Sequence, residues 1–420
     1  MTTQYDLIVR HATVLNISEV NTLVDIGVSG GKISAIAPQL NATARQEINA
    51  HGKLLSPPFV ESHIHLDSAL TAGDPRWNES GTLFEGIQIW GERKTQLTFE
   101  DVQQRAMQTL KQQASQGVLL VRTHADVSEP NLTALKALLA VREQVKDWIT
   151  VQVVAFPQDG IYSRPENEQL LREAVQLGAD GVGGIPHYEL TREDGVKSLQ
   201  CIFELAQDCD RLIDLHCDEI DDPQSRFLEV VAAYASRTGM GSKVTASHTC
   251  AMGSYENAYA YKLMGFLQRS QINIIANPLI NITLQGRTDS YPKRRGVTRV
   301  KELWQNGINV SLGHDCIQDP WYNLGTGNML EVGSMALHVC QMTGQREIAA
   351  CYEMITQNGA KTLNLEEEYG IEVGKPANFI LLDAENPYEV FCRRATVTHV
   401  VSRGKLLART PVVETEWLGQ

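Results

Sequence analysis

Residues 54–67 read Leu54-Leu55-Ser56-Pro57-Pro58-Phe59-Val60-Glu61-Ser62-His63-Ile64-His65-Leu66-Asp67. The run is mostly apolar up to Val60 and then carries two histidines two positions apart. In an extended strand such side chains point to the same face, so His63 and His65 aim at one point while Ile64 faces away. This is the geometry of a two-imidazole metal clamp. Taken alone, the stretch is also compatible with two core imidazoles bonded to the backbone.

The chain beyond this stretch alternates apolar strand-like runs with amphipathic helical segments. The later strand-like runs cover 117–124, 149–156, 178–185, 211–216, 244–248, 272–277 and 308–315. Together with the strand that leads into His63 they make eight. Strict alternation of strand and helix predicts a parallel sheet, and eight such units predict a closed (β/α)8 TIM barrel in the α/β class. A doubly wound open sheet is the alternative, but the sequence lacks a convincing Gly-rich nucleotide loop.

The two ends of the chain have a different pattern. Residues 1–56 contain short alternating runs with tight turns such as Gly30-Gly31, and residues 377–382 and 396–401 look alike at the other end. We therefore expect residues 1–56 and 370–420 to build one small flanking β-sandwich, with residues 57–369 as the metal-dependent barrel domain.

Composition narrows the functional class. The chain has 420 residues, 43% of them apolar, and a formal net charge of -13. Because no basic stripe stands out, a nucleic-acid partner is not expected. The first residues lack the charged and apolar regions of a signal peptide, and no apolar run approaches the roughly 18 residues of a membrane span. The eight cysteines include no C-x-x-C pair, which indicates reduced core thiols. A cytoplasmic enzyme acting on a small molecule is the simplest prediction.

The predicted strands end at residues whose side chains can bind a metal, transfer a proton or form hydrogen bonds. The active sites of TIM barrels lie at this end of the strands. The groups are His63, His65, His124, Gln158, His187, His216, His248, Asn277 and Asp315. Among them His63, His65, His216 and Asp315 form a nitrogen and oxygen set that suits zinc, iron or manganese rather than calcium. With four ligands assigned, supporting or structural roles are expected for His124 and His187.

Three further residues have candidate roles beside this metal site. Glu219 follows His216 by three and could shuttle a proton to a substrate ring nitrogen, although an acidic run at 218–222 also allows a solvated loop carboxylate. His248 could orient a hydroxide or be a barrel-layer histidine. Gln158 carries both a donor and an acceptor and could read a planar amide edge, or be an ordinary loop glutamine.

Trp321 could wall a flat ring or pack in the core. The segment His187-Tyr188-Glu189 matches the H-x-E half of the zinc nucleoside deaminase signature, but the P-C-x-x-C half is absent from the chain, which excludes that fold.

The chain resembles the amidohydrolase superfamily, and within it the bacterial cytosine deaminases, along nearly its whole length. A lone H-x-H is weak evidence, whereas the ordered set of motifs is highly specific. The motifs are 57–67, Trp77-Asn78, 80–86, 155–158, His216-Cys217-Asp218-Glu219, 246–249, 291–296, Gly313-His314-Asp315 and 319–322.

The resemblance implies a barrel with one divalent metal ion per chain, Zn²⁺ or Fe²⁺, and hydrolytic release of ammonia from a free pyrimidine base. It also implies a homo-oligomer. By matching position it assigns the four metal ligands, with Asp315 also catalytic, Glu219 as proton shuttle and His248 as hydroxide partner. The substrate-binding residues that it assigns are Gln158, Leu83, Phe156, Cys316 and Trp321.

Two alternatives stay open within this reading. Binuclear relatives such as dihydropyrimidinases generally bridge two metals with a carboxylated lysine at the fourth strand, but residues 178–186 contain no lysine. A cyclic-amide hydrolase is therefore less favoured than a deaminase. The substrate could also be isocytosine, isoguanine or another aminated heterocycle.

Cys316 is the informative departure from the family pattern. Cytosine deaminases of this type resemble one another in carrying a second aspartate directly after the metal-binding one, near the 5-position of the ring, whereas this chain reads His314-Asp315-Cys316. Placing a methyl group against a carboxylate costs on the order of 1 to 3 kcal/mol in lost hydration, and a thiol avoids that cost. We therefore expect 5-methylcytosine to be converted to thymine, and cytosine to uracil.

Overall fold

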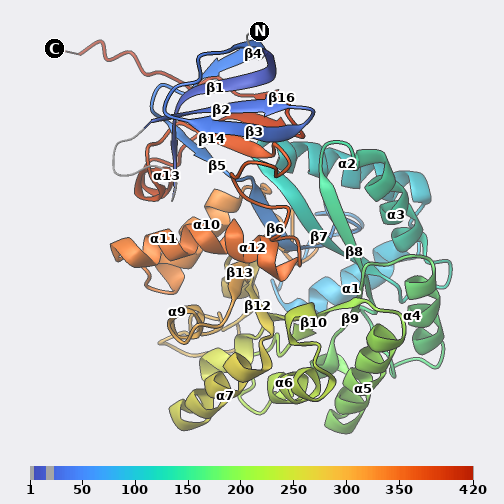
Figure 1. Cartoon of the computed structure of the whole chain (residues 1–420). Helices are drawn as coiled ribbons and strands as arrows, with labels where there is room; N and C mark the ends of the chain where they lie inside the picture. Colours follow the sequence, from blue (N-terminus) through green and yellow to red (C-terminus); the bar gives the residue numbers. More distant parts are fainter. Residues whose placement is uncertain (1–3, 16–22, 420) are drawn as a thin grey trace.

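Two eight-stranded sheets organise the protein (Figure 1). The computed structural model describes residues 4–15 and 23–419. One sheet is built from both ends of the chain, and the other from the middle. The fold class predicted from the sequence is confirmed.

The middle of the chain forms a closed parallel barrel, in which every strand pairs with its neighbour in chain order. Its strands are β6 (Phe59–Ile64), β7 (Val118–Asp126), β8 (Thr150–Phe156), β9 (Gly181–Gly184), β10 (Leu212–Cys217), β11 (Val244–His248), β12 (Asn273–Ala276) and β13 (Val310–Leu312). The ring closes between its first and last strands: His65 N donates to Asp315 O at 3.0 Å, and Asp315 N donates to His63 O at 2.8 Å. An open doubly wound sheet is therefore excluded.

Helices surround this barrel. They are α1 (Leu83–Lys94), α2 (Phe99–Ser115), α3 (Thr133–Val145), α4 (Asn167–Gln176), α5 (Arg192–Asp208), α6 (Phe227–Thr238), α7 (Asn257–Ser270), α8 (Pro278–Leu284), α9 (Val300–Gln305), α10 (Met329–Val339), α11 (Gln345–Met354) and α12 (Gln357–Thr362), with 3-10 turns at η1 (Pro186–Tyr188), η2 (Gly241–Lys243) and η3 (Cys250–Ser254). Helix α2 illustrates how the sequence specifies them. The Thr98 side chain caps its first turn by accepting from Asp101 N, and Val102, Ala106 and Leu110 recur every four residues and are buried.

The second sheet contains β1 (Gln4–Val14), β2 (Val24–Ser29), β3 (Lys32–Ala37), β4 (Thr43–Asn49), β5 (Leu54–Ser56), β14 (Phe379–Leu382), β15 (Val397–Ser402) and β16 (Lys405–Arg409), with the short helix α13 (Pro387–Cys392) before β15. Strand β1 pairs with β2 and β4 near its start and with β5 at its end, so it joins two halves of the sheet. Side chains from both halves, such as Ile26 and Phe379, share one apolar core. The limits of the two domains, 56/57 and 369/370, stay a prediction.

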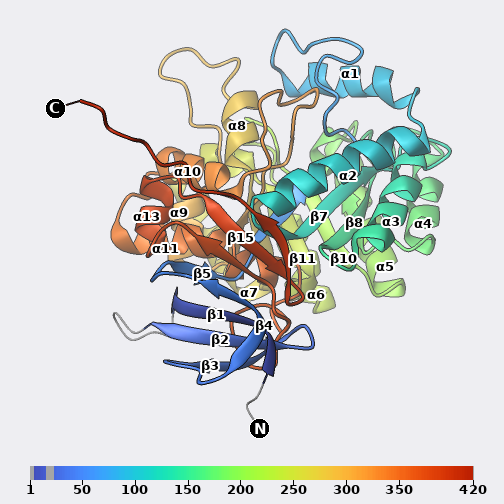
Figure 2. The ribbon, with the colours of Figure 1, turned by 90° about the horizontal axis from the view of Figure 1, so that it is seen from above.

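The barrel has two distinct ends. Figure 2 shows α1 and the loop that follows α8 at one end, and strands β1 to β3 toward the other. Residues 77–85 lead into α1, and residues 285–296 form the loop after α8. In the part of the chain that the structure describes, no helix is both long and apolar enough to cross a membrane.

Candidate metal centre and substrate pocket

The four predicted metal ligands meet inside the barrel. His65 Nε2 lies 3.0 Å from His216 Nε2. The Oδ1 atom of Asp315 lies 3.4 Å from His63 Nε2 and 3.5 Å from His65 Nε2. Donors about 2.0 to 2.1 Å from one tetrahedral ion lie roughly 3.3 Å apart, so these separations fit a single small divalent cation. All four side chains are buried.

The protonation state of these imidazoles also suits a metal. Burial first, and then the neighbouring histidines, hold the pKa of His63, His65 and His216 well below the ordinary value of 6.5. His63 Nε2 is buried and has no hydrogen-bond partner. A neutral imidazole with an unused, inward-facing nitrogen is what a metal ligand requires. The residues present therefore fit a divalent ion.

A buried hydrogen-bond chain orients His63 from behind. His63 Nδ1 lies 3.0 Å from Ser247 Oγ, and that hydroxyl donates to Asp214 Oδ1 at 2.7 Å. Burial alone would raise the pKa of Asp214, but hydrogen bonding and the charges of His124 and Arg122 outweigh it and lower the pKa. An ionised carboxylate only accepts, so Ser247 uses its proton there and accepts from His63 Nδ1. Nε2 is thus left free for the metal.

Arg122 anchors this chain at the floor of the site. Its guanidinium is almost completely buried and lies 3.0 Å from Asp214 Oδ2. It also donates to Gln152 Oε1 at 3.0 Å and to Thr362 O at 2.9 Å. Arg122, Asp214 and Ser247 were not predicted from the sequence. The strand period of two could have indicated Arg122 and Asp214. Arg122 precedes His124 by two positions, and Asp214 precedes His216 by two, so each faces inward with that histidine.

Glu219 and His248 form the second part of the site. Glu219 is only 3% exposed, so it is not a solvated loop carboxylate. Its Oε1 lies 3.1 Å from His248 Nδ1, and His248 Nε2 lies 3.9 Å from Asp315 Oδ2. Asn281 Nδ2 contacts His248 Nδ1 at 3.0 Å, and Asn277 Nδ2 lies 3.3 Å from either ring nitrogen. His248 thus lies between the predicted shuttle and the predicted ligands.

The backbone is unusual where two of these side chains enter the site. His248 and Asp315 both have φ of 69°, in the left-handed region that few residues other than glycine adopt and in which asparagine, aspartate and histidine are enriched. His248 ends β11, and Asp315 follows β13. Strained backbone of this kind costs about 1 to 3 kcal/mol and is concentrated at functional sites. Here it turns both side chains toward the cluster as the chain leaves the strand.

A small cavity opens directly above the ligands. It is lined by His65, Leu83, Gln158, Ile185, His216, Glu219, Ile280, Leu284, Asp315, Cys316 and Trp321. The predicted substrate residues Gln158, Leu83, Cys316 and Trp321 are all among them. Ile185, Ile280 and Leu284 were not predicted, because an apolar residue that lines a pocket has the same sequence pattern as one that fills a core. The lining therefore combines apolar side chains with polar groups.

The other predicted side chains lie just behind this cavity. The ring of Phe156 stacks on His216 with centroids 4.1 Å apart and planes 17° apart, so it supports a ligand from behind rather than lining the cavity. His124 lies 4.2 Å from His63, ring to ring, and its Nε2 is 3.6 Å from Asp214 Oδ1. Both ring nitrogens of His187 are buried without a hydrogen-bond partner.

Cys316 is 3% exposed and lies in an apolar cluster with Trp321, Ile280 and Leu284. Asp319 holds the segment that follows. Its carboxylate accepts from Ser68 Oγ at 3.0 Å and from Trp321 N at 2.9 Å. Burial raises the pKa of Asp319 to about 6, and raises that of the Cys316 thiol well above 9. Cys316 is therefore a neutral thiol beside an apolar wall.

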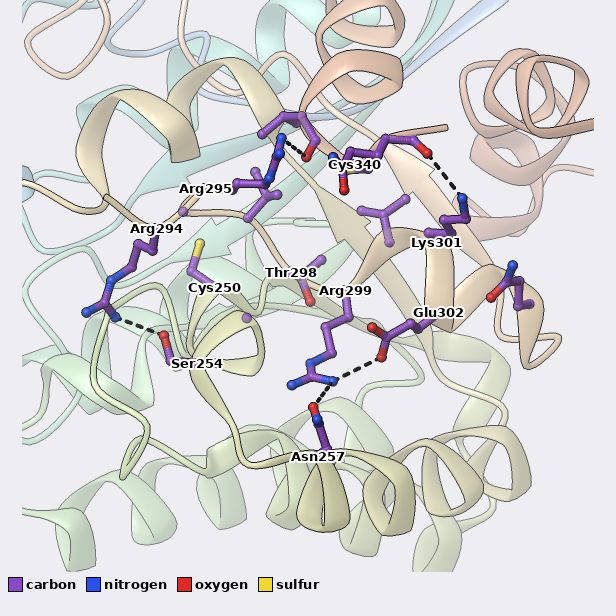
Figure 3. A pocket seen from close by; sticks show the side chains of 17 residues that line it. Cys250, Ser254, Asn257, Arg294, Arg295, Thr298, Arg299, Lys301, Glu302 and Cys340 are labelled. Atoms are coloured by element: carbon purple, nitrogen blue, oxygen red, sulfur yellow. Dashed lines mark hydrogen bonds and ion pairs between the residues drawn. The ribbon is translucent and has the colours of Figure 1, made fainter. Parts of the chain in front are cut away.

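A larger cavity, of about 680 Å³, has different chemistry (Figure 3). Its basic side chains are already engaged: Arg294 lies against Ser254, Arg299 against Asn257 and Glu302, and Lys301 donates to Gln341 O. It contains none of the residues of the metal cluster. The small cavity above the ligands is therefore the candidate active site.

Comparisons with known proteins agree with this geometry. The model of the amidohydrolase family matches residues 46–408. The chain belongs to the amidohydrolase family. It is 29% identical to the N-isopropylammelide isopropyl amidohydrolase of Pseudomonas sp. strain ADP, over 98% of this chain and 100% of that one. It is also 29% identical to the pterin deaminase of Rhizobium rhizogenes, over 92% of this chain and 88% of that one.

Among solved structures, the 5-methylcytosine deaminase of Klebsiella pneumoniae liganded with 5-fluorocytosine is similar over 98% of this chain and 99% of that chain. It has a TM-score of 0.95 and 50% sequence identity. This amidohydrolase is therefore a hydrolytic enzyme of C–N bonds. Among the described residues, two overlapping groups could hold a metal ion: His63, His216, His248 and Asp315, and His63, His65 and His124.

Proposed function

We propose that this amidohydrolase deaminates free cytosine-type bases, converting 5-methylcytosine and water to thymine and ammonia, and cytosine and water to uracil and ammonia. The observation that carries the proposal is a neutral, buried Cys316 beside Trp321 in a cavity directly above the histidine and aspartate cluster. The solved relative that is 50% identical is itself a 5-methylcytosine deaminase.

One divalent ion per chain, Zn²⁺ or Fe²⁺, would be held by His63, His65, His216 and Asp315. Such an ion supplies hydroxide near neutral pH, because it lowers the pKa of a water molecule from 15.7 to roughly 7. The absence of a lysine from β9 supports a single ion over a carboxylate-bridged pair. This stoichiometry separates a deaminase from a cyclic-amide hydrolase.

The chain's own residues then divide the proton transfers and the recognition of the base. Glu219 faces the cavity and can take one proton from the attacking water and pass it to the ring nitrogen, where it stays. It can then carry the second proton, from the hydroxyl now on the ring carbon, to the amino group, which leaves as ammonia. His248, beside both Glu219 and Asp315, is placed to orient the attacking water. The Gln158 amide offers a donor and an acceptor to the ring's amide edge.

Recognition of the methyl group follows from Cys316. A carboxylate at this position would lose its water against a methyl group, at about 1 to 3 kcal/mol, whereas a neutral thiol would not. Burying the methyl group adds about 0.8 kcal/mol, so the avoided penalty is the larger effect.

Two features of the setting belong to the same proposal. The substrate is a small free base rather than a nucleic acid, and the enzyme works as a cytoplasmic homo-oligomer. Size-exclusion chromatography with light scattering would test the assembly.

The function is tested by steady-state ammonia release from cytosine and 5-methylcytosine with purified, metal-loaded protein. We expect turnover of both bases, with the higher kcat/KM for 5-methylcytosine. Ultraviolet spectra should identify uracil and thymine as the products. Absence of ammonia release from either base, with release from isocytosine or isoguanine, would move the proposal to that alternative substrate class.

A further inference from the structure

Helix α1 contains two glycines with very different surroundings. Gly86 is buried, and a Cβ placed there would lie within 3.0 Å of three indole atoms of Trp321: Cδ1, Nε1 and Cγ, the last at 2.8 Å. Ordinary contacts to a Cβ are 3.4 to 4 Å. At Gly91, in the same helix, a Cβ would meet nothing within 4 Å. Only Gly86 lets the indole lie directly on the helix backbone.

The backbone of Trp321 has little freedom to give way. Its N–H donates to Asp319 Oδ1 at 2.9 Å, and the same oxygen accepts from Tyr322 N at 3.0 Å. The other oxygen of Asp319 accepts from Ser68 Oγ. An added atom at position 86 would therefore turn the indole rather than shift the loop that carries it.

Helix α1 is held just as firmly. Lys94 is buried and lies 3.2 Å from Asp126 Oδ2 and 2.8 Å from Asp159 Oδ2. Trp90 Nε1 donates to the same Asp126 oxygen at 2.8 Å. Asn78 Nδ2 bridges Thr82 O, at the start of the helix, to Pro320 O, next to Trp321, at 3.0 Å each. The helix and the indole are thus fixed relative to one another.

Trp321 also lines the cavity. Its ring centroid lies 6.4 Å from that of His65, and it shares an apolar cluster with Cys316. An indole turned away from the helix would therefore enter the space beside Cys316. We propose that Gly86 is a specificity-determining residue: by seating Trp321 on α1 it preserves the room that a 5-substituent needs. This inference rests on the proposed deaminase function.

The size of the 5-substituent determines which base should lose most activity when the space beside Cys316 is closed. Hydrogen, fluorine and a methyl group fill progressively more of that space, so the loss on closing it should rise in the order cytosine, 5-fluorocytosine, 5-methylcytosine. Gly86 acts on the substrate only through Trp321, which makes it a positioning residue rather than a catalytic one.

The experiment compares kcat/KM for the three bases in the unsubstituted enzyme, Gly86→Ala and Gly91→Ala. Both variants gain the same intrinsic helix propensity. We expect Gly86→Ala to lower the ratio of kcat/KM for 5-methylcytosine to that for cytosine at least tenfold, with 5-fluorocytosine between them. Gly91→Ala should leave the ratio unchanged. Equal losses for all three bases, or no difference between the two variants, would overturn the inference.

A second measurement does not depend on turnover. The melting temperature of Gly86→Ala should be lower than that of Gly91→Ala, and the difference should vanish when both are made in a Trp321→Leu background, where the indole is gone. A difference that persists there would show that Gly86 does not act through Trp321. If the unsubstituted enzyme released ammonia from none of the bases, the proposed function would be wrong. The comparison of melting temperatures would still test whether Gly86 acts through Trp321.

Discussion

His63 Nδ1 and Ser247 Oγ lie 3.0 Å apart, although 184 positions separate the two residues in the chain. The Ser247 proton is committed to the ionised Asp214, so the imidazole must donate and present Nε2 to the cluster. Ser247, which is not itself a predicted ligand, thus sets the tautomer of a predicted metal ligand.

Replacing Ser247 by alanine should weaken metal binding about 10- to 100-fold, because the imidazole loses the partner that fixes its tautomer. Competition with a chelator would measure the dissociation constant, and Co²⁺ substitution would report the ligand geometry by visible absorption. Ser247→Thr keeps a hydroxyl on a strand that accepts β-branched residues, and should stay near the original affinity. Unchanged affinity in Ser247→Ala would contradict the assignment.

Replacing Glu219 by glutamine should reduce kcat by roughly 10² to 10⁴, since the amide cannot cycle a proton. Metal content should be unchanged, because Glu219 is not among the predicted ligands. Asp222→Asn is a matched control from the same acidic run, as its side chain is exposed and accepts from Gln224 N. Similar kcat values for the two variants would remove Glu219 from the proposed mechanism.

Removing the metal should lower thermal stability as well as activity, because binding to the folded chain alone stabilises it by about 2.7 kcal/mol when the free ion is at 100 times its dissociation constant. Melting curves recorded with and without a chelator would show this loss. Elemental analysis should give one ion per chain. Two ions per chain would favour the cyclic-amide hydrolase alternative.

The terminal sheet offers a test on the acid side. Burial would raise the pKa of Asp25, but hydrogen bonds from Leu40 N and His11 N, and the Arg10 guanidinium at 2.9 Å, outweigh burial and lower the pKa below 3.8. A lowered folded pKa means that this carboxylate stabilises the fold above pH 3.8, and that the stabilisation is lost as the pH falls below it.

Asp25→Asn should therefore lower the free energy of unfolding by about 1 to 3 kcal/mol at pH 7 and by less near pH 3. Urea unfolding at both pH values would measure the two differences. A loss of the same size at both would show that the charge of Asp25 is not the cause.

Strand period explains how much of the site could be predicted. His63 and His65 face one point because they are two apart in β6, and the barrel order then brings His216 and Asp315 to the same rim. The same rule applied to Arg122 and Asp214 predicts that they face inward. Their chemistry was not predicted, because a buried ion pair is defined by its partner across the barrel, and one strand does not reveal that partner.

Other features depend on distances that a sequence does not contain. Gly86 was recognised only as part of a family motif, and its role follows from an indole 235 positions away in the chain, a contact visible only in three dimensions. Asp218 is similar: it lies in a run that looks solvated, yet it is buried and its carboxylate accepts from Phe227 N and Leu228 N at the start of α6. The sequence alone does not show whether an acidic residue caps a helix or carries a charge at the surface.

The most direct test of the central claim is the ratio of kcat/KM for 5-methylcytosine to that for cytosine, measured side by side in the unsubstituted enzyme, Cys316→Asp and Cys316→Asn. Asparagine matches the shape of aspartate without its charge, and so separates size from desolvation. The account predicts a ratio above one in the unsubstituted enzyme and a fall of about tenfold or more in Cys316→Asp, with a smaller fall in Cys316→Asn. Equal effects of Cys316→Asp on the two bases would contradict it.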